Sequence, residues 1–285
     1  MPGFSFALCA DDYALTPGVS DGILALLEAR RITATSVMTT RPHWRAAAPA
    51  LRAHRDRADI GLHFDLTLGP SLGRLPRLAP DGRLPALSRL LALALAGRID
   101  AQEIRAELGR QLDAFEAEFG RLPDYVDGHQ HVHMLPGIRD AVLDEMSARG
   151  LTGKIWLRDS TDRTAAILSR AVEARKALIV AMLGAGFARA ARARGFALNR
   201  GFSGFSAFDP ARPFARDVAS YLRAPGPAHL VMCHPGHADA MLAGLDPATG
   251  SREAELAFLL SDEFLAVLAG RGARLARMSA ILGRA

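Results

Sequence analysis

Short β-branched or apolar runs alternate with longer helical segments along most of this chain. The runs do not alternate regularly between apolar and polar positions, which is typical of strands that are buried on both faces. They cover residues 4–10, 33–40, 58–66, 124–130, 154–159, 228–234 and 273–278. The pattern therefore predicts about seven buried strands.

Segments with helical periodicity fill the intervals between these runs. Pro17 stands in the first turn of one such segment, where proline is favoured. Asp100 with Glu103 three residues later resembles a capping box at the start of another. The predicted helices span 17–31, 44–56, 86–96, 100–119, 137–150, 211–223 and 251–269, and a long helical region covers 161–195. A loop rich in glycine and phenylalanine, NRGFSGFSAFDP, follows that region.

This alternation predicts an α/β fold. Strands that are separated by helices form a parallel sheet, and the helices pack against its faces. About seven strands fit a distorted, incomplete (β/α) barrel, and an open doubly wound sheet is the alternative. No repeat or low-complexity linker interrupts the pattern, so we expect residues 1–285 to form a single domain.

The composition is that of a globular protein. Of the 285 residues, 49% are hydrophobic and 23% are charged, and the net charge is +5. The positive charge comes almost entirely from arginine, since Lys154 and Lys176 are the only lysines. The arginines are scattered along helical segments without an aromatic-rich basic motif, so we expect no nucleic-acid partner.

The chain carries no pattern that suggests a disulfide framework or a membrane span. Cys9 and Cys233 both lie in apolar runs and are expected to be buried, reduced thiols. The first residues lack the basic start of a signal peptide. The longest apolar run, residues 177–188, is shorter than the roughly 18 residues that span a bilayer. We therefore expect a cytoplasmic protein with no transmembrane segment, and the run 177–188 suits a homodimer interface and the core equally.

Six polar residues fall at or near the ends of the predicted strands. The carboxyl ends of parallel strands converge on one face of an α/β barrel, where active sites are built. We therefore expect a single site that contains Asp11, Asp12, His63, His129, Arg158 and His234.

Two local patterns assign different roles within this set. Adjacent positions on a strand point to opposite sides, so Asp11 and Asp12 are expected to act differently. In DGHQHVH, an extended backbone would place His129, His131 and His133 on one face. His129 is nearest the strand end and is the expected metal ligand, whereas the other two are expected to line the pocket or to orient neighbours.

One carboxylate and two imidazoles with vacant positions suit a catalytic divalent metal. Zn²⁺ fits readily, Mn²⁺ and Fe²⁺ also fit, and Mg²⁺ fits less naturally because it prefers oxygen ligands. Such an ion lowers the pKa of bound water and polarises a carbonyl or phosphoryl oxygen. A free carboxylate beside it can take a proton, and a histidine opposite can give one. The residues thus predict metal-assisted hydrolysis.

Four motifs in this order resemble the YdjC-like carbohydrate deacetylases from about residue 5 to 270: CADDYALTPGVSDGI, IGLHFDLTLG, DYVDGHQHVHMLPG and MCHPG. The resemblance implies a distorted (β/α) barrel that removes N-acetyl groups from amino sugars with one divalent metal, Mg²⁺ or Zn²⁺. It also implies that the metal ligands are Asp12, His63 and His129, that the general base is Asp11, and that the acid is His234. Arg158 matches more loosely and is expected to steady Asp11 or the substrate.

The chain departs from this family pattern at two places and matches it least in a third. Tyr13 and Ala14 replace a usual Phe-Gly pair, and His237 replaces an aromatic residue after HPG. His237 and Asp239 otherwise read as ordinary polar loop residues. The segment 160–210 matches least, and we expect it to be a helical and loop insertion that shapes the substrate pocket.

The substrate and two rival functions remain open at this point. The acetylated amino sugar is a chitooligosaccharide or a lipid-linked glycan. A metal-dependent phosphoesterase usually needs two metals or several cations, and only Arg158 is evident. A non-catalytic sugar-binding protein would not need the spare carboxylate of Asp11. The phenylalanines of the glycine-rich loop suit stacking on sugars and core packing equally: Phe202, Phe205 and Phe208.

Overall fold

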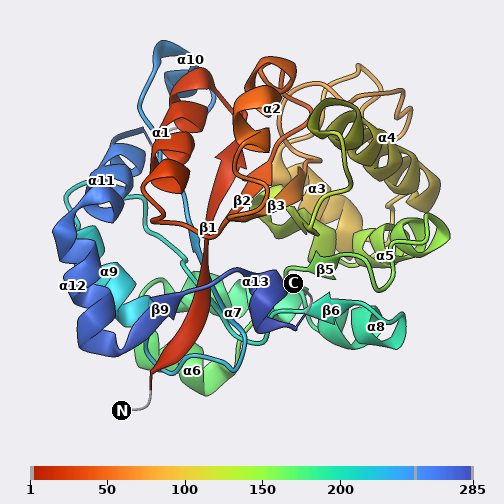
Figure 1. Ribbon diagram of the computed structural model, residues 1–285. Coiled ribbons are helices and arrows are strands. Elements are labelled where there is room, and N and C mark those ends of the chain that lie inside the picture. Colours follow the sequence, from red (N-terminus) through yellow and green to blue (C-terminus); the bar gives the residue numbers. More distant parts are fainter. Residues whose placement is uncertain (1–2, 247–248, 284–285) are drawn as a thin grey trace.

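A parallel β-sheet forms the centre of the molecule. The computed structural model describes residues 3–246 and 249–283. Within these residues the strand order is β6-β5-β4-β3-β2-β1-β8-β7, and β9 pairs with β1. The strands are β1 (Phe4–Tyr13), β2 (Ala34–Val37), β3 (Asp59–Phe64), β4 (Tyr125–Gly128), β5 (Trp156–Leu157), β6 (Ala197–Leu198), β7 (Phe202–Ser203), β8 (His229–Cys233) and β9 (Ala273–Leu275). The eight strands of the main path curl into a half-barrel, which confirms the predicted incomplete α/β barrel (Figure 1).

Helices flank the sheet along its curve (Figure 1). They are α1 (Pro17–Glu28), α2 (Trp44–Arg52), α3 (Leu87–Leu95), α4 (Ala101–Phe119), α5 (Ile138–Ala148), α6 (Thr164–Arg170), α7 (Ala174–Leu183), α8 (Phe187–Ala193), α9 (Phe214–Tyr221), α10 (Ala240–Ala243), α11 (Thr249–Leu260), α12 (Asp262–Arg271) and α13 (Met278–Ile281), with a 3-10 segment η1 (His129–Met134). Asp100 caps α4 by accepting hydrogen bonds from the backbone N–H groups of Gln102 and Glu103, as the sequence predicted.

The long helical region and one predicted helix are each divided into shorter helices. The region 161–195 forms α6, α7 and α8, because Ala171 adopts φ of +60° after α6 and Gly186 adopts φ of +90° before α8. The predicted helix 251–269 is divided at Ser261, whose side chain caps α12. The two-residue strand β6 lies just before the loop predicted from Asn199, and the two-residue strand β7 lies within that loop. Strands this short leave no periodicity in the sequence.

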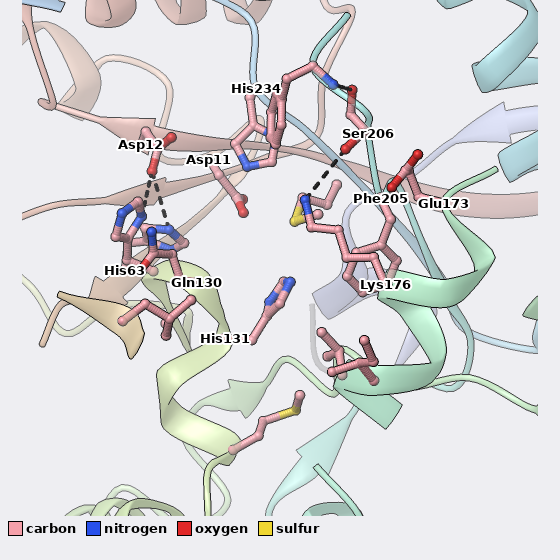
Figure 2. Close-up of a pocket in the computed structure, with 18 of the residues that line it drawn as sticks. Asp11, Asp12, His63, Gln130, His131, Glu173, Lys176, Phe205, Ser206 and His234 are labelled. Atoms are coloured by element: carbon pink, nitrogen blue, oxygen red, sulfur yellow. Dashed lines mark hydrogen bonds and ion pairs between the residues drawn. The ribbon is translucent and has the colours of Figure 1, made fainter. Parts of the chain in front are cut away.

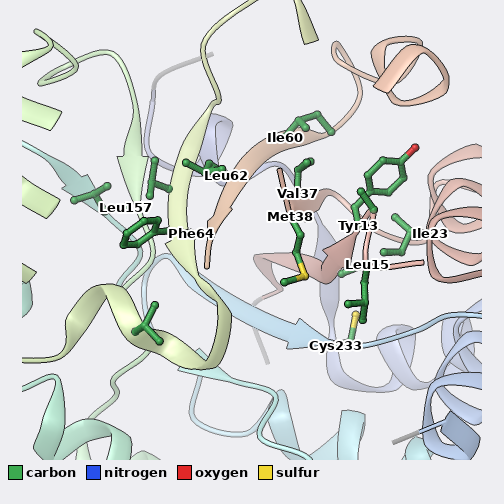
Figure 3. Close-up of a cluster of buried hydrophobic side chains, with 14 of the residues drawn as sticks. Tyr13, Leu15, Ile23, Val37, Met38, Ile60, Leu62, Phe64, Leu157 and Cys233 are labelled. Carbon is green, nitrogen blue, oxygen red and sulfur yellow. The ribbon is translucent and has the colours of Figure 1, made fainter. Parts of the chain in front are cut away.

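Side chains of β1 alternate between the two faces of the sheet. Phe6 and Leu8 pack in the large apolar cluster between sheet and helices, and Ala7 and Cys9 pack in a second cluster on the other face. Figure 3 shows part of the large cluster, where Ile60, Leu62 and Phe64 of β3 lie near side chains of neighbouring strands. On the face of the second cluster, β1 therefore carries the small residues Ala7 and Cys9, and Asp11 follows them.

Two further expectations concern the thiols and the membrane. Cys9 and Cys233 are buried and free, as predicted. None of the helices within the described ranges combines the length and apolar character that a bilayer crossing requires.

Candidate active site

A cavity of about 600 Å³ opens at the carboxyl ends of the strands. Five of the six predicted site residues line it: Asp11, Asp12, His63, His129 and His234. Figure 2 shows Asp12 and His63 on one side of the cavity and Lys176 on the opposite side, with Asp11 between them. The sheet thus brings together side chains that are far apart in the sequence.

Asp12 lies at the centre of one cluster. Its Oδ1 atom lies 3.4 Å from Nε2 of His63 and 3.2 Å from Nδ1 of His129. Asp12 has φ of +71°, which breaks the alternation of β1 at its end. The expectation that Asp11 and Asp12 would face opposite sides is therefore wrong, because both line the cavity. They nevertheless have different partners.

The Asp12, His63 and His129 cluster fits a divalent metal. One ligand atom from each residue lies within 4.8 Å of the others. The Nδ1–H group of His63 donates to Oδ1 of Asp127 at 2.7 Å, so the Nε2 lone pair faces Asp12. Lone pairs that converge in this way need a proton or a cation between them. A mixed nitrogen and oxygen set with room on the cavity side suits Zn²⁺ or Mn²⁺.

Protons compete with a cation at this cluster. Burial alone would lower the pKa of His63, but the carboxylates of Asp127 and Asp12 raise it to about 10. The second oxygen of Asp12 accepts a 2.6 Å bond from Nη2 of Arg252. Burial raises the pKa of Asp12, but Arg252 first and the two histidines next hold it well below its ordinary value. Asp12 is therefore a carboxylate, and its Oδ1 atom is directed at the imidazoles.

Asp11 is held by a second cluster. Nη1 and Nη2 of Arg158 bind its two oxygens at 2.6 and 2.7 Å, which is a bidentate ion pair. Nη2 of Arg158 also lies 2.6 Å from Asp127 and 2.9 Å from the sulfur of Cys9. Cys9, Asp11 and Asp127 have the spacing of a metal site as well, but the guanidinium group occupies that position.

Arg158 does not reach the cavity. Its side chain is fully buried, and it is absent from the cavity lining. Its ion pair with Asp11 is compatible with the first of the two roles expected for it, that of steadying Asp11. Nη2 of Arg158 also donates to Ser36 Oγ at 3.2 Å. Ser36 Oγ in turn lies 2.8 Å from Tyr125 Oη and donates to Asp127 at 2.6 Å.

The three histidines of HQHVH point in different directions. Gln130 and His131 have φ of +52° and +61°, and the segment forms η1. The prediction of an extended strand to residue 130, with the histidines on one face, is therefore wrong. His131 lines the cavity with its ring 5.4 Å from that of Phe205. His133 turns away, and its Nε2–H group donates to the carbonyl of Arg158 at 2.8 Å.

His234 follows β8 on another side of the cavity. Its backbone N–H donates to Glu255 at 2.6 Å, and its ring lies 5.2 Å from that of Phe208. Among the described residues, no side chain or backbone group bonds its Nδ1 atom. Burial lowers the pKa of His234 to about 4, so the ring is neutral at pH 7 in the free protein.

Two nearby loop residues have structural contacts. His237 is exposed, and its backbone N–H donates to the carbonyl of Gly18. Asp239 accepts from the backbone N–H groups of Leu242 and Gly18 and so joins α10 to α1.

The segment 160–210 forms part of the cavity wall. From α7, Lys176, Ile179 and Leu183 line it, and Leu87 and Leu91 of α3 line it as well. Aliphatic and charged side chains therefore share this wall.

The loop phenylalanines divide between two environments. Phe202 is buried, and the guanidinium of Arg158 lies 6.0 Å from the centre of its ring. Phe205 and Phe208 both line the cavity. The ammonium group of Lys176 lies 4.8 Å from the centre of the Phe208 ring.

Several charged or polar residues of the site were missed from the sequence, among them Arg252, Ser36 and Asp127. Arg252 is 240 positions from Asp12, in a helix with no distinguishing motif. Ser36 lies in TATSVMTT, where four threonines surround it and nothing distinguishes it. Asp127 alone had a signal, since it stands two residues before His129 and its strand neighbour is His63.

The sequence and the fold were compared with known proteins. The pattern of the family described as YdjC-like protein matches residues 5–270. A carbohydrate deacetylase of Homo sapiens is 30% identical over 55% of this chain and 53% of its own length. A chitooligosaccharide deacetylase of Serratia marcescens is 35% identical over 55% of this chain and 62% of its own length. The match thus spans little more than half of these relatives.

Solved structures share the fold. An Enterococcus faecalis V583 protein named for cellobiose-phosphate cleavage superposes with a TM-score of 0.73 at 22% identity, over 98% of this chain and 99% of that one. A family 4 acetyl xylan esterase from Clostridium thermocellum, solved with a cobalt ion, has a TM-score of 0.50 at 10% identity, over 98% and 90%. At these identities the likeness concerns the fold alone.

Proposed function

This chain belongs to the YdjC-like protein family, and from that premise we propose that it is a metal-dependent deacetylase of N-acetylated amino sugars. One observation carries the proposal. The Asp12, His63 and His129 donor set, the clamped carboxylate of Asp11 and the ring of His234 line the same cavity. The names of the human and Serratia marcescens relatives support the same reaction class.

Asp12, His63 and His129 would hold the metal. When bound, a divalent ion polarises a carbonyl oxygen and lowers the pKa of water. Two neighbours orient these ligands, since Arg252 binds one oxygen of Asp12 and Asp127 binds Nδ1 of His63. Both contacts leave the other oxygen of Asp12 and Nε2 of His63 facing each other.

Asp11 is the proposed general base. Its carboxylate accepts a proton from the attacking water, and the bidentate pair with Arg158 fixes its orientation. His234 is the proposed acid, which protonates the departing amine. Because its ring is neutral at pH 7 in the free protein, the proton that it delivers must be taken up during turnover. Asp11 gains a proton in the first step and lies in the same cavity, so it is the proposed source of that proton.

The walls of the cavity bear on the substrate. Phe205 and Phe208 offer ring faces of the kind that pack against sugars, near the polar end. The apolar side chains of Leu87, Leu91 and Ile179, which also line the cavity, would contact an apolar part of the substrate. Of the two substrates that the sequence leaves open, this lining favours a lipid-linked glycan over a chitooligosaccharide.

Acetate release tests the proposal. Diacetylchitobiose and an N-acetylglucosamine that carries a long alkyl chain would be supplied with Zn²⁺ or Mn²⁺, with and without chelator. We expect metal-dependent release that an Asp11→Asn variant loses, with faster release from the alkyl glycoside. No release from either sugar by the metal-loaded protein would contradict the deacetylase proposal. Faster release from diacetylchitobiose would contradict only the preference for a lipid-linked substrate.

Phosphoester hydrolysis has less support. Arg158 is paired with Asp11 and Asp127, and Arg252 is paired with Asp12 and Asp246. The charge of both guanidinium groups is therefore largely neutralised by carboxylates, which leaves less of it for a phosphate. Phosphate release from aryl phosphates in the same assay is the check.

A further inference from the structure

Asp127 is a buried carboxylate that touches both halves of the site without lining the cavity. Its side chain is fully buried at the end of β4. Oδ1 accepts the Nδ1–H of His63 at 2.7 Å, and Oδ2 lies 2.6 Å from Nη2 of Arg158. We propose that Asp127 is a positioning residue that couples the metal ligand His63 to the arginine that clamps Asp11.

The sheet itself creates this bridge. In the parallel pairing of β3 with β4, His63 and Asp127 are direct register partners. Arg158 follows β5, the next strand along, and its backbone N–H donates to the carbonyl of Val126. Three neighbouring strand ends therefore hold one chain of contacts that runs from His63 through Asp127 and Arg158 to Asp11. A shift of Asp127 moves both ends of that chain.

A carboxylate is required at position 127 because both neighbours donate. An asparagine has the same shape but one oxygen and one NH₂ group. If the oxygen faces His63, the NH₂ group opposes the guanidinium of Arg158. If the NH₂ group faces His63, the ring must carry its proton on Nε2, which blocks the lone pair that faces Asp12. Asp127→Asn therefore damages one contact in either orientation.

Asp59 offers a matched comparison in the neighbouring strand. It is also fully buried, and its carboxylate accepts hydrogen bonds from the backbone N–H and the hydroxyl of Ser279 at 2.8 and 2.6 Å. It begins β3, whereas His63 lies near the end of that strand. Asp59→Asn thus removes a buried charge without touching the site.

Calorimetric titration with Zn²⁺ alone is the first measurement. We expect Asp127→Asn to weaken zinc binding about 10- to 100-fold, which is the usual effect of losing a carboxylate behind a histidine ligand. Asp59→Asn is expected to stay within about twofold of the wild type. Unchanged zinc affinity in Asp127→Asn, or an equal loss in Asp59→Asn, would overturn the proposal.

Kinetics at saturating zinc test the second arm. A role toward the metal alone predicts that excess zinc restores kcat, whereas the bridge predicts a kcat about 100-fold lower with KM little changed, because Asp11 is displaced. Full recovery of kcat would overturn the coupling. If Asp127→Asn does not fold, Asp127→Glu keeps the charge with altered reach. It should weaken zinc binding as well, and wild-type affinity there would also overturn the proposal.

This inference rests on the proposed function: its zinc arm on the proposed metal site alone, and its kinetic arm on the proposed reaction as well. Zinc affinity is measured without substrate, so it tests the bridge between Asp127 and His63 even if no N-acetylated sugar is turned over. Failure of the deacetylase proposal and failure of the bridge are therefore separate results.

Discussion

His234 shows how one side chain can be tested apart from its surroundings. Its ring lines the cavity, and it does not belong to the predicted ligand set. We expect His234→Gln to lower kcat for acetate release by about 10²- to 10⁴-fold, which is the usual contribution of a proton donor. Zinc affinity should change little, because Asp12, His63 and His129 are intact. Steady-state kinetics and zinc titration of the same preparation measure both quantities.

His237→Gln is the matched control for that substitution. His237 lies three residues later in the same loop, is exposed and does not line the cavity. The kcat of His237→Gln is expected to stay within about twofold of that of the wild type, as is usual for exposed positions away from the site. Equal losses in the two variants would mean that the loop conformation, and not the His234 ring, supports the reaction.

At the scale of the element, the close approach of β3 to β4 depends on a glycine. A Cβ atom at Gly61 would lie 2.4 Å from ring atoms of Tyr125, which stacks on Trp156 at 4.1 Å. The ring cannot move freely, so we expect Gly61→Ala to lower the free energy of unfolding by about 1–3 kcal/mol through overpacking. Urea unfolding followed by circular dichroism measures this change.

Gly270 in α12 provides the opposite case. A Cβ there has no atom within 4 Å. Gly270→Ala is therefore expected to raise the free energy of unfolding by up to about 1 kcal/mol, since alanine favours a helix interior. If both glycine variants shifted stability in the same direction, packing against Tyr125 would not be the reason that residue 61 is a glycine.

The sequence predicted most elements because burial leaves a periodic signal, and it failed where that signal is absent. Strand β1 runs to Tyr13, three residues past its predicted end, because Asp11 and Asp12 are polar residues inside a strand. Strands β6 and β7 have two residues each and no pattern. The division of 161–195 into three helices depends on positive φ values, which a helical periodicity does not reveal.

The site was predictable as far as strand ends could be identified. That reasoning selected six residues, and the family resemblance then named Asp12, His63 and His129 as ligands. One ligand atom of each of these three lies within 4.8 Å of the others. It did not find Arg252, whose contact with Asp12 depends on how α11 packs against the rest of the chain. It also placed the three histidines of HQHVH on one face, because a turn with two left-handed residues cannot be inferred from polar spacing.

At the scale of the whole molecule, the proposed metal ligands Asp12, His63 and His129 come from segments that lie far apart in the sequence. A ligand that binds only the folded state stabilises it by mass action. We expect Zn²⁺ at 100 times its dissociation constant to raise the free energy of unfolding by about 2.7 kcal/mol. His129→Ala should abolish most of this gain, and His237→Ala should retain it. Thermal unfolding with and without zinc is the measurement, and an equal gain in His129→Ala would argue against the predicted ligand set.

The pH dependence of global stability reflects histidines that are buried in the neutral form. Burial and the nearby Arg170 lower the pKa of His229 to about 4, and its Nδ1 atom accepts the backbone N–H of Gly226. The unfolded chain takes up a proton near pH 6.5 and the folded one only near pH 4, so this group removes stability as the pH falls between those values.

His229→Asn removes that titration. The stability difference between wild type and variant should therefore shrink by roughly 3 kcal/mol from pH 7.5 to pH 4.5. Other groups increase the stability as the pH falls, such as Glu255, whose pKa burial raises to about 7. Their contribution cancels in this comparison because both proteins contain them. Urea unfolding without metal at several pH values gives the difference directly. A difference that stays constant over this range would mean that His229 is not held neutral by the fold.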